Sequence, residues 1–229
     1  MDRRTAGDVM ADGQQSVNFR VATGLSEQIA SHLETQIIAG VLRSGQRIQE
    51  SKVVQELSVS RGPVREALLI LSRRRLIQLF PRRGAIVMPL NAPLVHSLSQ
   101  AVELLMREVL RDQAGRWTEL KGRQLDDVAS RSRAQYGLTN PFCVLKFLAK
   151  DHPNPIYGDV ISDLLPTLDR VFGKLTRHHP ECARYLKELV MHDLVPALEA
   201  HSVEGVTRVI GALCRGVERK YLESLERTG

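Results

Sequence analysis

The chain has 229 residues, of which 43% are hydrophobic and 25% charged, and its formal net charge is +6. This length predicts one small and one medium domain. Leu, Val and Ala supply most of the apolar volume, which favours packed helices over a β-sandwich. No apolar run approaches the roughly 20 residues of a membrane span, and the polar N-terminus lacks the apolar core of a signal peptide. We therefore expect a soluble, cytoplasmic protein.

The positive charge is concentrated in one part of the chain. Residues 1–90 contain 13 Lys and Arg against 8 Asp and Glu, whereas residues 91–229 contain 19 against 18. Seven arginines and a single acid, Glu66, fall within Leu57–Leu90. A basic stretch beside a nearly neutral remainder favours a polyanion-binding module joined to a domain of another kind.

The sequence carries no signature of an enzyme. It has no Ser/His/Asp elbow, Gly-rich phosphate loop or His-Glu-x-x-His motif. Its three cysteines are odd in number and widely spaced, and they lack the Cys-x-x-Cys pairs of a zinc ribbon. We expect Cys143, Cys182 and Cys214 to be buried, reduced thiols.

The first predicted elements are an arm and two helices. Residues 1–22 show no periodicity and are expected to form a flexible arm. Helical spacing of apolar residues runs from Leu25 to Ile38, with Gly40 as a stop. A turn over residues 41–48 then precedes a short second helix from about Ser51 to Leu57.

The third predicted helix, from Arg61 to about Arg75, has the features of a recognition helix. Ser60 can cap it, and Pro63 lies in its first turn, where a missing N–H costs nothing. Arg61 and Arg65 are four residues apart, so they share the outer face near its start. A short turn between two helices makes a helix-turn-helix, in which the start of the second helix reaches base edges. The arginine fork suits this role because it pairs with O6 and N7 of guanine.

A β-hairpin follows this helix. Leu76–Phe80 and Ala85–Met88 are strand-like runs, and Pro81-Arg82-Arg83-Gly84 forms the loop between them. Arginines at the tip of such a wing would contact phosphates or enter the minor groove. Residues 23–90 are therefore predicted to form a winged helix-turn-helix DNA-binding domain.

Three segments resemble the DNA-binding domain of the GntR family: Ile37–Ser51, Ser58–Leu68 and Pro81–Val87. The match covers about residues 24–89 without a gap. The resemblance implies contacts with bases and backbone at the start of the third helix, a base contact one turn on, and minor-groove entry at the wing tip. Ser51 stands where the family often has a basic residue that contacts DNA, and the neighbouring Lys52 can supply that contact instead. Glu66 is expected to be a structural or N–H-orienting residue and not a base reader. The DNA-binding residues are thus predicted to be Ser60, Arg61, Arg65, Arg82, Arg83, Gly84 and Lys52.

The remainder, residues 91–229, is predicted to be an all-α bundle of about six helices, so the whole fold is mainly α. No period-two strand pattern, internal repeat or low-complexity tract is present in it. Behind a GntR-type winged helix, it resembles the effector-binding and dimerisation domain of the FadR/VanR (FCD-type) branch. The expected helices are Leu94–Trp117, Leu120–Tyr136, Pro141–Lys150, Pro155–His178, Glu181–Ala200 and Val203–Arg227.

Most members of that branch hold a metal through an Asp and a His on one helix and two His on later helices. Counting from matching segments places these four positions near Pro141, Leu145, Met191 and Leu213, none of which is a ligand. We therefore expect no metal and no other cofactor. A variant site would use His152 and His192, with Asp151 or Asp193.

Without a metal, an effector would depend on a cavity and a few polar groups of the bundle. The candidates are Arg107, Tyr136, Arg170, His192 and Arg215. The leading hypothesis is a nucleoid-associated repressor, a homodimer that binds a pseudo-palindromic double-stranded DNA operator and responds to a small organic metabolite. One alternative is a constitutive DNA-binding dimer without an effector, and another is a metal-dependent, enzyme-like domain fused to a winged helix.

Overall fold

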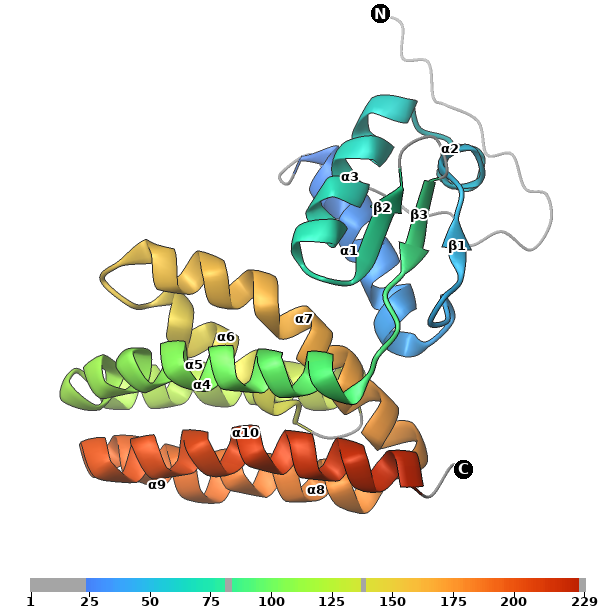
Figure 1. Cartoon of the computed structure of the whole chain (residues 1–229). Helices are drawn as coiled ribbons and strands as arrows, with labels where there is room; N and C mark the ends of the chain where they lie inside the picture. The colour runs from blue at the N-terminus through green and yellow to red at the C-terminus, as the bar shows by residue number, and fades with distance from the viewer. Residues whose placement is uncertain (1–23, 81–83, 137–138, 227–229) are drawn as a thin grey trace, which may run out of the picture.

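The computed structural model describes residues 24–80, 84–136 and 139–226 (Figure 1). The predicted arm, residues 1–22, lies outside the described residues. An N-terminal domain of three helices and a small sheet is followed by a helical bundle (Figure 1). None of the helices described combines the length and apolarity that crossing a membrane requires.

The N-terminal domain is a winged helix-turn-helix, as predicted. Its elements are α1 (Leu25–Ala39), β1 (Arg47–Ile48), α2 (Glu50–Leu57), α3 (Arg61–Arg73), β2 (Ile77–Phe80) and β3 (Gly84–Val87). The strands form one antiparallel sheet in the order β1-β3-β2. Helix α1 ends at Gly40, whose φ of 77° is the left-handed conformation that glycine tolerates. Ser60 is the N-cap residue of α3, but its hydroxyl makes no capping hydrogen bond, contrary to our expectation.

Strand β1 was not predicted, because its two residues lie in a segment that was interpreted as a turn. Arg47 pairs with Ile86 and Ile48 with Ala85, so β1 covers the outer edge of β3. The Ile48 side chain joins the buried core of this domain while Arg47 is exposed. A two-residue strand is too short for a period-two pattern, and it forms because β3 offers it free backbone groups.

The bundle contains α4 (Ala92–Gly115), α5 (Glu119–Tyr136), α6 (Pro141–Lys150), α7 (Pro155–His178), α8 (Pro180–Glu188), α9 (Val195–Glu199) and α10 (Val203–Glu226). Helices α4, α6 and α7 begin in the same way, with an asparagine cap and a proline in the first turn. The side chains of Asn91, Asn140 and Asn154 accept a backbone N–H at 2.9–3.1 Å. Five of the six predicted helices start within one residue of the expected position, and the asparagine caps account for the starts of α6 and α7, which are predicted without error.

The fifth predicted helix is interrupted. A π-helical segment, η1 (Leu189–Leu194), separates α8 from α9. Pro196 has no N–H for the carbonyl four residues earlier, and its ring would clash with that carbonyl in a regular α-helix. The wider π turn before Pro196 accommodates this conflict.

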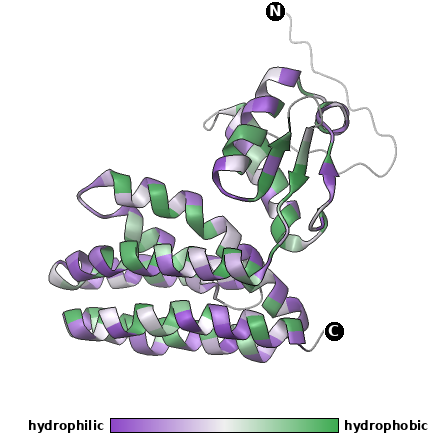
Figure 2. Cartoon of the chain, viewed as in Figure 1, coloured by the Kyte–Doolittle hydropathy of each residue, from purple (hydrophilic) through white to green (hydrophobic). Residues whose placement is uncertain are grey.

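The buried apolar residues form two separate clusters, one in the winged helix and one in the bundle. Hydrophobic and hydrophilic residues alternate along the bundle helices (Figure 2), so each helix turns an apolar stripe inward. Helices α4 and α10 pack along one another (Figure 1), and α7 contacts both of them as well as α1 of the winged helix. Helix α7 therefore joins the two domains.

Candidate nucleic-acid interface

A cleft opens on the winged helix between α2, α3 and the sheet. Arg47 of β1, Ser51 of α2, Arg61 and Arg65 of α3 and Gly84 of β3 are among the residues that line it. The structure thus brings together three of the predicted DNA-binding residues, from α3 and β3. Three arginines in one open cleft create a positive surface of the kind that attracts the phosphate backbone.

The start of α3 presents unpaired donors. Ser60 and Arg61 are exposed, and within the part of the chain that the structure describes, the Arg61 side chain makes no ion pair or hydrogen bond. The first N–H groups of a helix carry partial positive charge, which favours a phosphate at this end. This combination fits the predicted contacts with base edges and backbone.

Arg65 lies one turn further along α3 and is held by an acid. Its Nε donates to Oε2 of Glu50, the first residue of α2, at 3.0 Å. Neither Arg47 nor Glu50 was predicted to belong to the site. Their roles depend on how β1 and α2 pack against α3, and no local pattern in the sequence reports that packing.

The β2–β3 hairpin, which forms the wing, requires a glycine at position 84. Gly84 has a φ of +81°, and a Cβ there would lie 2.9 Å from the carbonyl oxygen of Ile48. A larger residue would therefore strain the backbone and separate β3 from β1. Arg82 and Arg83 lie outside the described residues, so their contacts stay a prediction.

Two further predicted residues lie beside the cleft. Lys52 is exposed on α2 but is not among the residues that line the cleft. Glu66, expected to be structural, accepts a hydrogen bond from the Ser26 hydroxyl of α1. This bond joins α3 to α1, in agreement with a structural role.

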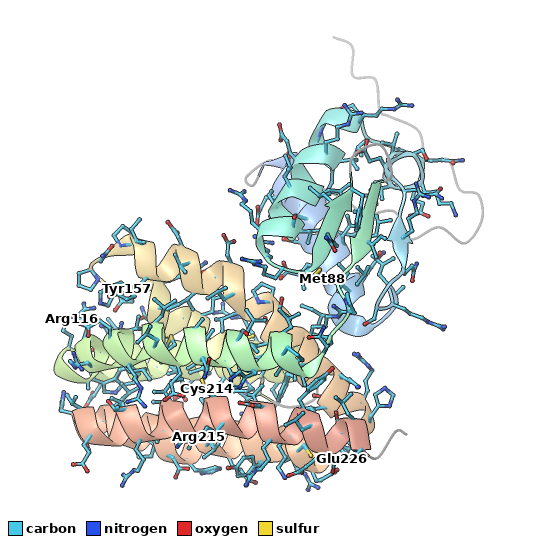
Figure 3. All side chains as sticks on the ribbon, viewed as in Figure 1. Met88, Arg116, Tyr157, Cys214, Arg215 and Glu226 are labelled. Atoms are coloured by element: carbon cyan, nitrogen blue, oxygen red, sulfur yellow. The ribbon has the colours of Figure 1, made fainter. Side chains whose placement is uncertain are left out.

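Two of the predicted effector-binding residues meet on the surface of the bundle. Arg107 of α4 and Arg215 of α10 line a shallow cleft around Gly211 (Figure 3 labels Arg215). Arg107 is also paired with Glu103 at 2.5 Å. The cleft is open to solvent, and Arg107, Arg208 and Arg215 outnumber Glu204 among the residues that line it, so it is suited to an anionic ligand that also has an apolar part.

The remaining effector candidates are not brought together. His192, a candidate on account of its chemistry, is exposed on η1 and does not line the cleft of Arg107 and Arg215. The π turn changes the register of the side chains around it, which period-3.6 reasoning could not anticipate. The side chain of Tyr136 lies outside the described residues.

Arg170 of α7, another of these candidates, lies at the junction between the domains. It is only 4% exposed, and it donates to the carbonyl of Met88, in the linker after β3, and to the hydroxyl of Ser44 at 2.7 Å (Figure 3 labels Met88). No carboxylate of the described residues forms an ion pair with it. Burial therefore lowers the pKa of Arg170 to about 10, opposed by the phenol of Tyr221.

Three neighbours of Arg170 on α7 also contact the winged helix. The Thr167 hydroxyl donates to the carbonyl of Arg74 at 3.0 Å, and Nη1 of Arg177 donates to the carbonyl of Ile38 at 2.9 Å. A Cβ at Gly173 would lie 2.9 Å from that same Ile38 oxygen. We call Thr167, Arg170, Gly173 and Arg177 the docking face of α7.

A polar cluster lies where α5, α6 and α7 meet. Nδ2 of Asn140 donates to Oδ1 of Asp169 at 2.8 Å, and the backbone N–H of Asn140 donates to the Ser132 hydroxyl at 2.7 Å. Burial raises the pKa of Asp169 to about 7, and the nearby charge of Glu34 in α1 adds to the rise. The Asn140 hydrogen bond and Lys146 oppose it.

The described residues offer no cluster of three His, Cys, Asp or Glu side chains that could hold a metal. The variant site of His152 and His192 is therefore not supported. His152 accepts the backbone N–H of Asn154 at 3.1 Å and lies against Tyr157 (labelled in Figure 3), with ring centroids 4.6 Å apart and ring planes tilted by 55°, while His192 is exposed. Leu145 and Leu213, which stand near two of the positions where the FadR/VanR branch has metal ligands, are fully buried.

Comparisons with known proteins agree with this geometry. Residues 25–87 match the model of the bacterial regulatory proteins of the gntR family. The HTH-type transcriptional repressor RspR of Escherichia coli (strain K12) is 30% identical over 195 residues, which cover 81% of this chain and 84% of that protein. The gluconate operon transcriptional repressor of Bacillus licheniformis is 37% identical over 97 residues, 42% of this chain. The chain spans only 38% of the length of that relative and 28% of its Bacillus subtilis counterpart.

Two solved structures share the fold. Escherichia coli McbR/YncC aligns with a TM-score of 0.71 at 18% identity, over 89% of this chain and 99% of that one. A putative transcriptional regulator GntR from Rhodococcus sp. RHA1 aligns with a TM-score of 0.66 at 20% identity, over 88% of this chain and 99% of that one. The arrangement of a winged helix followed by a helical domain is therefore common to these chains.

Proposed function

The chain belongs to the GntR family of bacterial regulatory proteins, and we propose that it is a transcriptional repressor of the family's FadR/VanR branch. DNA binding and transcriptional regulation follow from the family. The observation that carries the proposal is the cleft in which Arg47, Arg61, Arg65 and Gly84 converge. Repression is supported by the names of relatives such as RspR and the gluconate operon repressors.

The proposed active form is a homodimer in the cytoplasm. A two-fold symmetric pair would place two α3 helices in successive major grooves, about 34–36 Å apart, on a pseudo-palindromic operator. Arg61 would contact backbone and bases at the start of α3, and Arg65 would read a guanine. Lys52, Arg82 and Arg83 would add contacts that make affinity depend on salt.

We propose further that a small organic metabolite in the helical domain controls this binding, without a metal or other cofactor. The cleft of Arg107 and Arg215 supports an anionic metabolite, and the docking face of α7 supplies a physical connection to the winged helix. A ligand that prefers one position of α7 would alter the pose of the DNA-binding domain.

One observation favours a second candidate, a constitutive DNA-binding dimer. Buried Leu145 and Leu213 occupy positions that hold metal ligands in the branch that the chain resembles. A domain that has lost those ligands could have kept only its dimerising role. The two candidates differ in whether any metabolite changes operator affinity or melting temperature.

The test of the proposal starts from duplexes containing 20 random base pairs. Selection with the wild-type protein is expected to enrich a pseudo-palindromic sequence. Arg65→Ala should weaken binding to that sequence by about 1–3 kcal/mol without affecting dimerisation in sedimentation experiments. Arg73→Ala is the matched control, because Arg73 is exposed on α3 but does not line the cleft. Equal affinities of the wild type and Arg65→Ala would refute the recognition-helix assignment.

A further inference from the structure

One carboxylate stands among the arginines of the DNA-binding cleft. Glu50 accepts the hydrogen bond of Arg65 Nε, and the two side chains are 33% and 64% exposed. An exposed ion pair of this kind adds little to stability. A negative charge beside the DNA backbone also weakens non-specific binding. Neither protein stability nor non-specific DNA affinity therefore accounts for an acid at position 50, and we look for its role in the recognition of bases.

We propose that Glu50 is a positioning residue that orients Arg65 and thereby sets the base preference of the operator position that Arg65 reads. This inference rests on the proposed function and names the residue that gives Arg65 its specificity. It concerns the hydrogen bond of Glu50 and not its charge alone.

The geometry of the guanidinium supports this role. Arginine has five N–H donors in a rigid plane, and Glu50 occupies the one on Nε. The outer edge, formed by the two terminal nitrogens, stays available for O6 and N7 of guanine. Because the carboxylate limits the orientations of an exposed side chain, less freedom is lost when Arg65 meets the base.

Arg61 provides the contrast within the same helix. It shares the outer face of α3 with Arg65, yet its side chain has no hydrogen-bonding partner among the described residues. An arginine without a fixed orientation adapts to phosphates and to any base. We therefore expect Arg61 to contribute affinity with little discrimination, and Arg65 with its Glu50 partner to contribute the discrimination.

Two substitutions separate position from charge. Glu50→Gln keeps the length and an oxygen that accepts from Nε, but it removes the charge. Glu50→Asp keeps the charge at the start of α2, where an acid favours the helix dipole, but it is one methylene too short for the 3.0 Å bond. Glu56→Ala, an exposed acid of the same helix outside the cleft, is the control.

The assay is competition binding of full-length protein to the selected duplex and to every single-base variant of it. Loss of a paired contact to one base corresponds to about a 5- to 150-fold change in preference. At the operator positions where Arg65→Ala reduces the preference for one base over the others, we expect Glu50→Asp to reduce that preference as well, by at least about fivefold in relative affinity. Glu50→Gln is expected to keep that preference and to bind a random duplex more tightly than the wild type does.

The outcomes distinguish the inference from the proposed function. If Arg65→Ala leaves every preference unchanged, the assignment of Arg65 fails, and the inference fails with it. If Arg65→Ala flattens a position that Glu50→Asp leaves intact, only the positioning role is overturned. Flattening by Glu50→Gln with retention by Glu50→Asp would likewise overturn it, because charge and not the hydrogen bond would be responsible. Melting temperatures measured for each variant ensure that folded proteins are compared.

Discussion

Replacing Arg170 by Met is expected to loosen the winged helix from α7 while the bundle stays intact. Methionine has a similar length but cannot donate to the Met88 carbonyl or to the Ser44 hydroxyl. A hydrogen bond from a charged group contributes about 1.5–3 kcal/mol. Against this, a guanidinium whose pKa falls from 12.5 to about 10 costs the folded state about 3 kcal/mol. The two bonds together contribute about 3–6 kcal/mol, so the net loss of docking free energy is up to about 3 kcal/mol.

Amide hydrogen exchange measures this loss at the junction itself. The amides of Gly45, Val87 and Met88 form backbone hydrogen bonds of 2.9 Å within the winged helix, next to the Met88 carbonyl and the Ser44 hydroxyl to which Arg170 donates. A decrease of up to about 3 kcal/mol in the free energy of local opening accelerates their exchange by up to about 150-fold. Amides in the middle of α10 should exchange as in the wild type.

The control is Arg111→Met, because Arg111 is an exposed arginine of α4 whose one ion pair among the described residues is with Glu108. It should leave exchange at the junction unchanged. Unaltered exchange of the three junction amides in Arg170→Met would refute the docking role. Equal acceleration at the junction and in α10 would show instead that Arg170 stabilises the whole protein.

Three further predictions concern stability and DNA affinity. Because the pKa of Asp169 rises from 3.8 to about 7 on folding, the free energy of unfolding should fall by up to about 4 kcal/mol between pH 4 and pH 8. Asp169→Asn should remove this slope in urea titrations, and a slope that persists would contradict the assignment. Gly173→Ala should lower the melting temperature, because its Cβ would lie 2.9 Å from a carbonyl oxygen of α1, whereas Gly115→Ala meets nothing within 4 Å; equal melting temperatures would argue against the close contact. Arg82→Ala and Arg83→Ala should each reduce the dependence of log affinity on log salt by about one, and an unchanged slope in both would exclude phosphate contacts.

Much of the fold follows from local signals in the sequence. The predicted bounds of α6 and α7 equal the observed ones. An Asn-Pro pair fixes the start of each helix, and a proline shortly after its last residue (Pro153 or Pro180) prevents the helix from continuing. The recognition helix and the wing were equally predictable, since the positions of Arg61, Pro63 and Gly84 follow from helix and hairpin geometry. In these segments short-range chemistry determines the outcome.

The parts that could not be predicted depend on contacts between distant segments. Strand β1 exists because β3 pairs with it, and η1 exists because Pro196 disturbs a helix that is otherwise regular. The pair of Glu50 and Arg65 is 15 residues apart in sequence, and no pattern within either helix indicates it. Arg170 was expected to bind an effector on the basis of its chemistry, whereas its observed hydrogen bonds go to residues 82 and 126 positions away.

The docking face of α7 has a property that bears on regulation. Three of its side chains donate to backbone carbonyls, at the ends of α1 and α3 and in the linker after β3. Because these acceptors belong to the backbone, they constrain the position of the winged helix regardless of its side chains. A helix that moves as a rigid rod displaces all of them together, so a small shift of α7 becomes a change in the pose of the whole DNA-binding domain. The buried charge of Arg170 has no carboxylate partner among the described residues, and its desolvation offsets part of the stabilisation from its hydrogen bonds. A ligand that prefers one position of α7 would act against the docking free energy that remains.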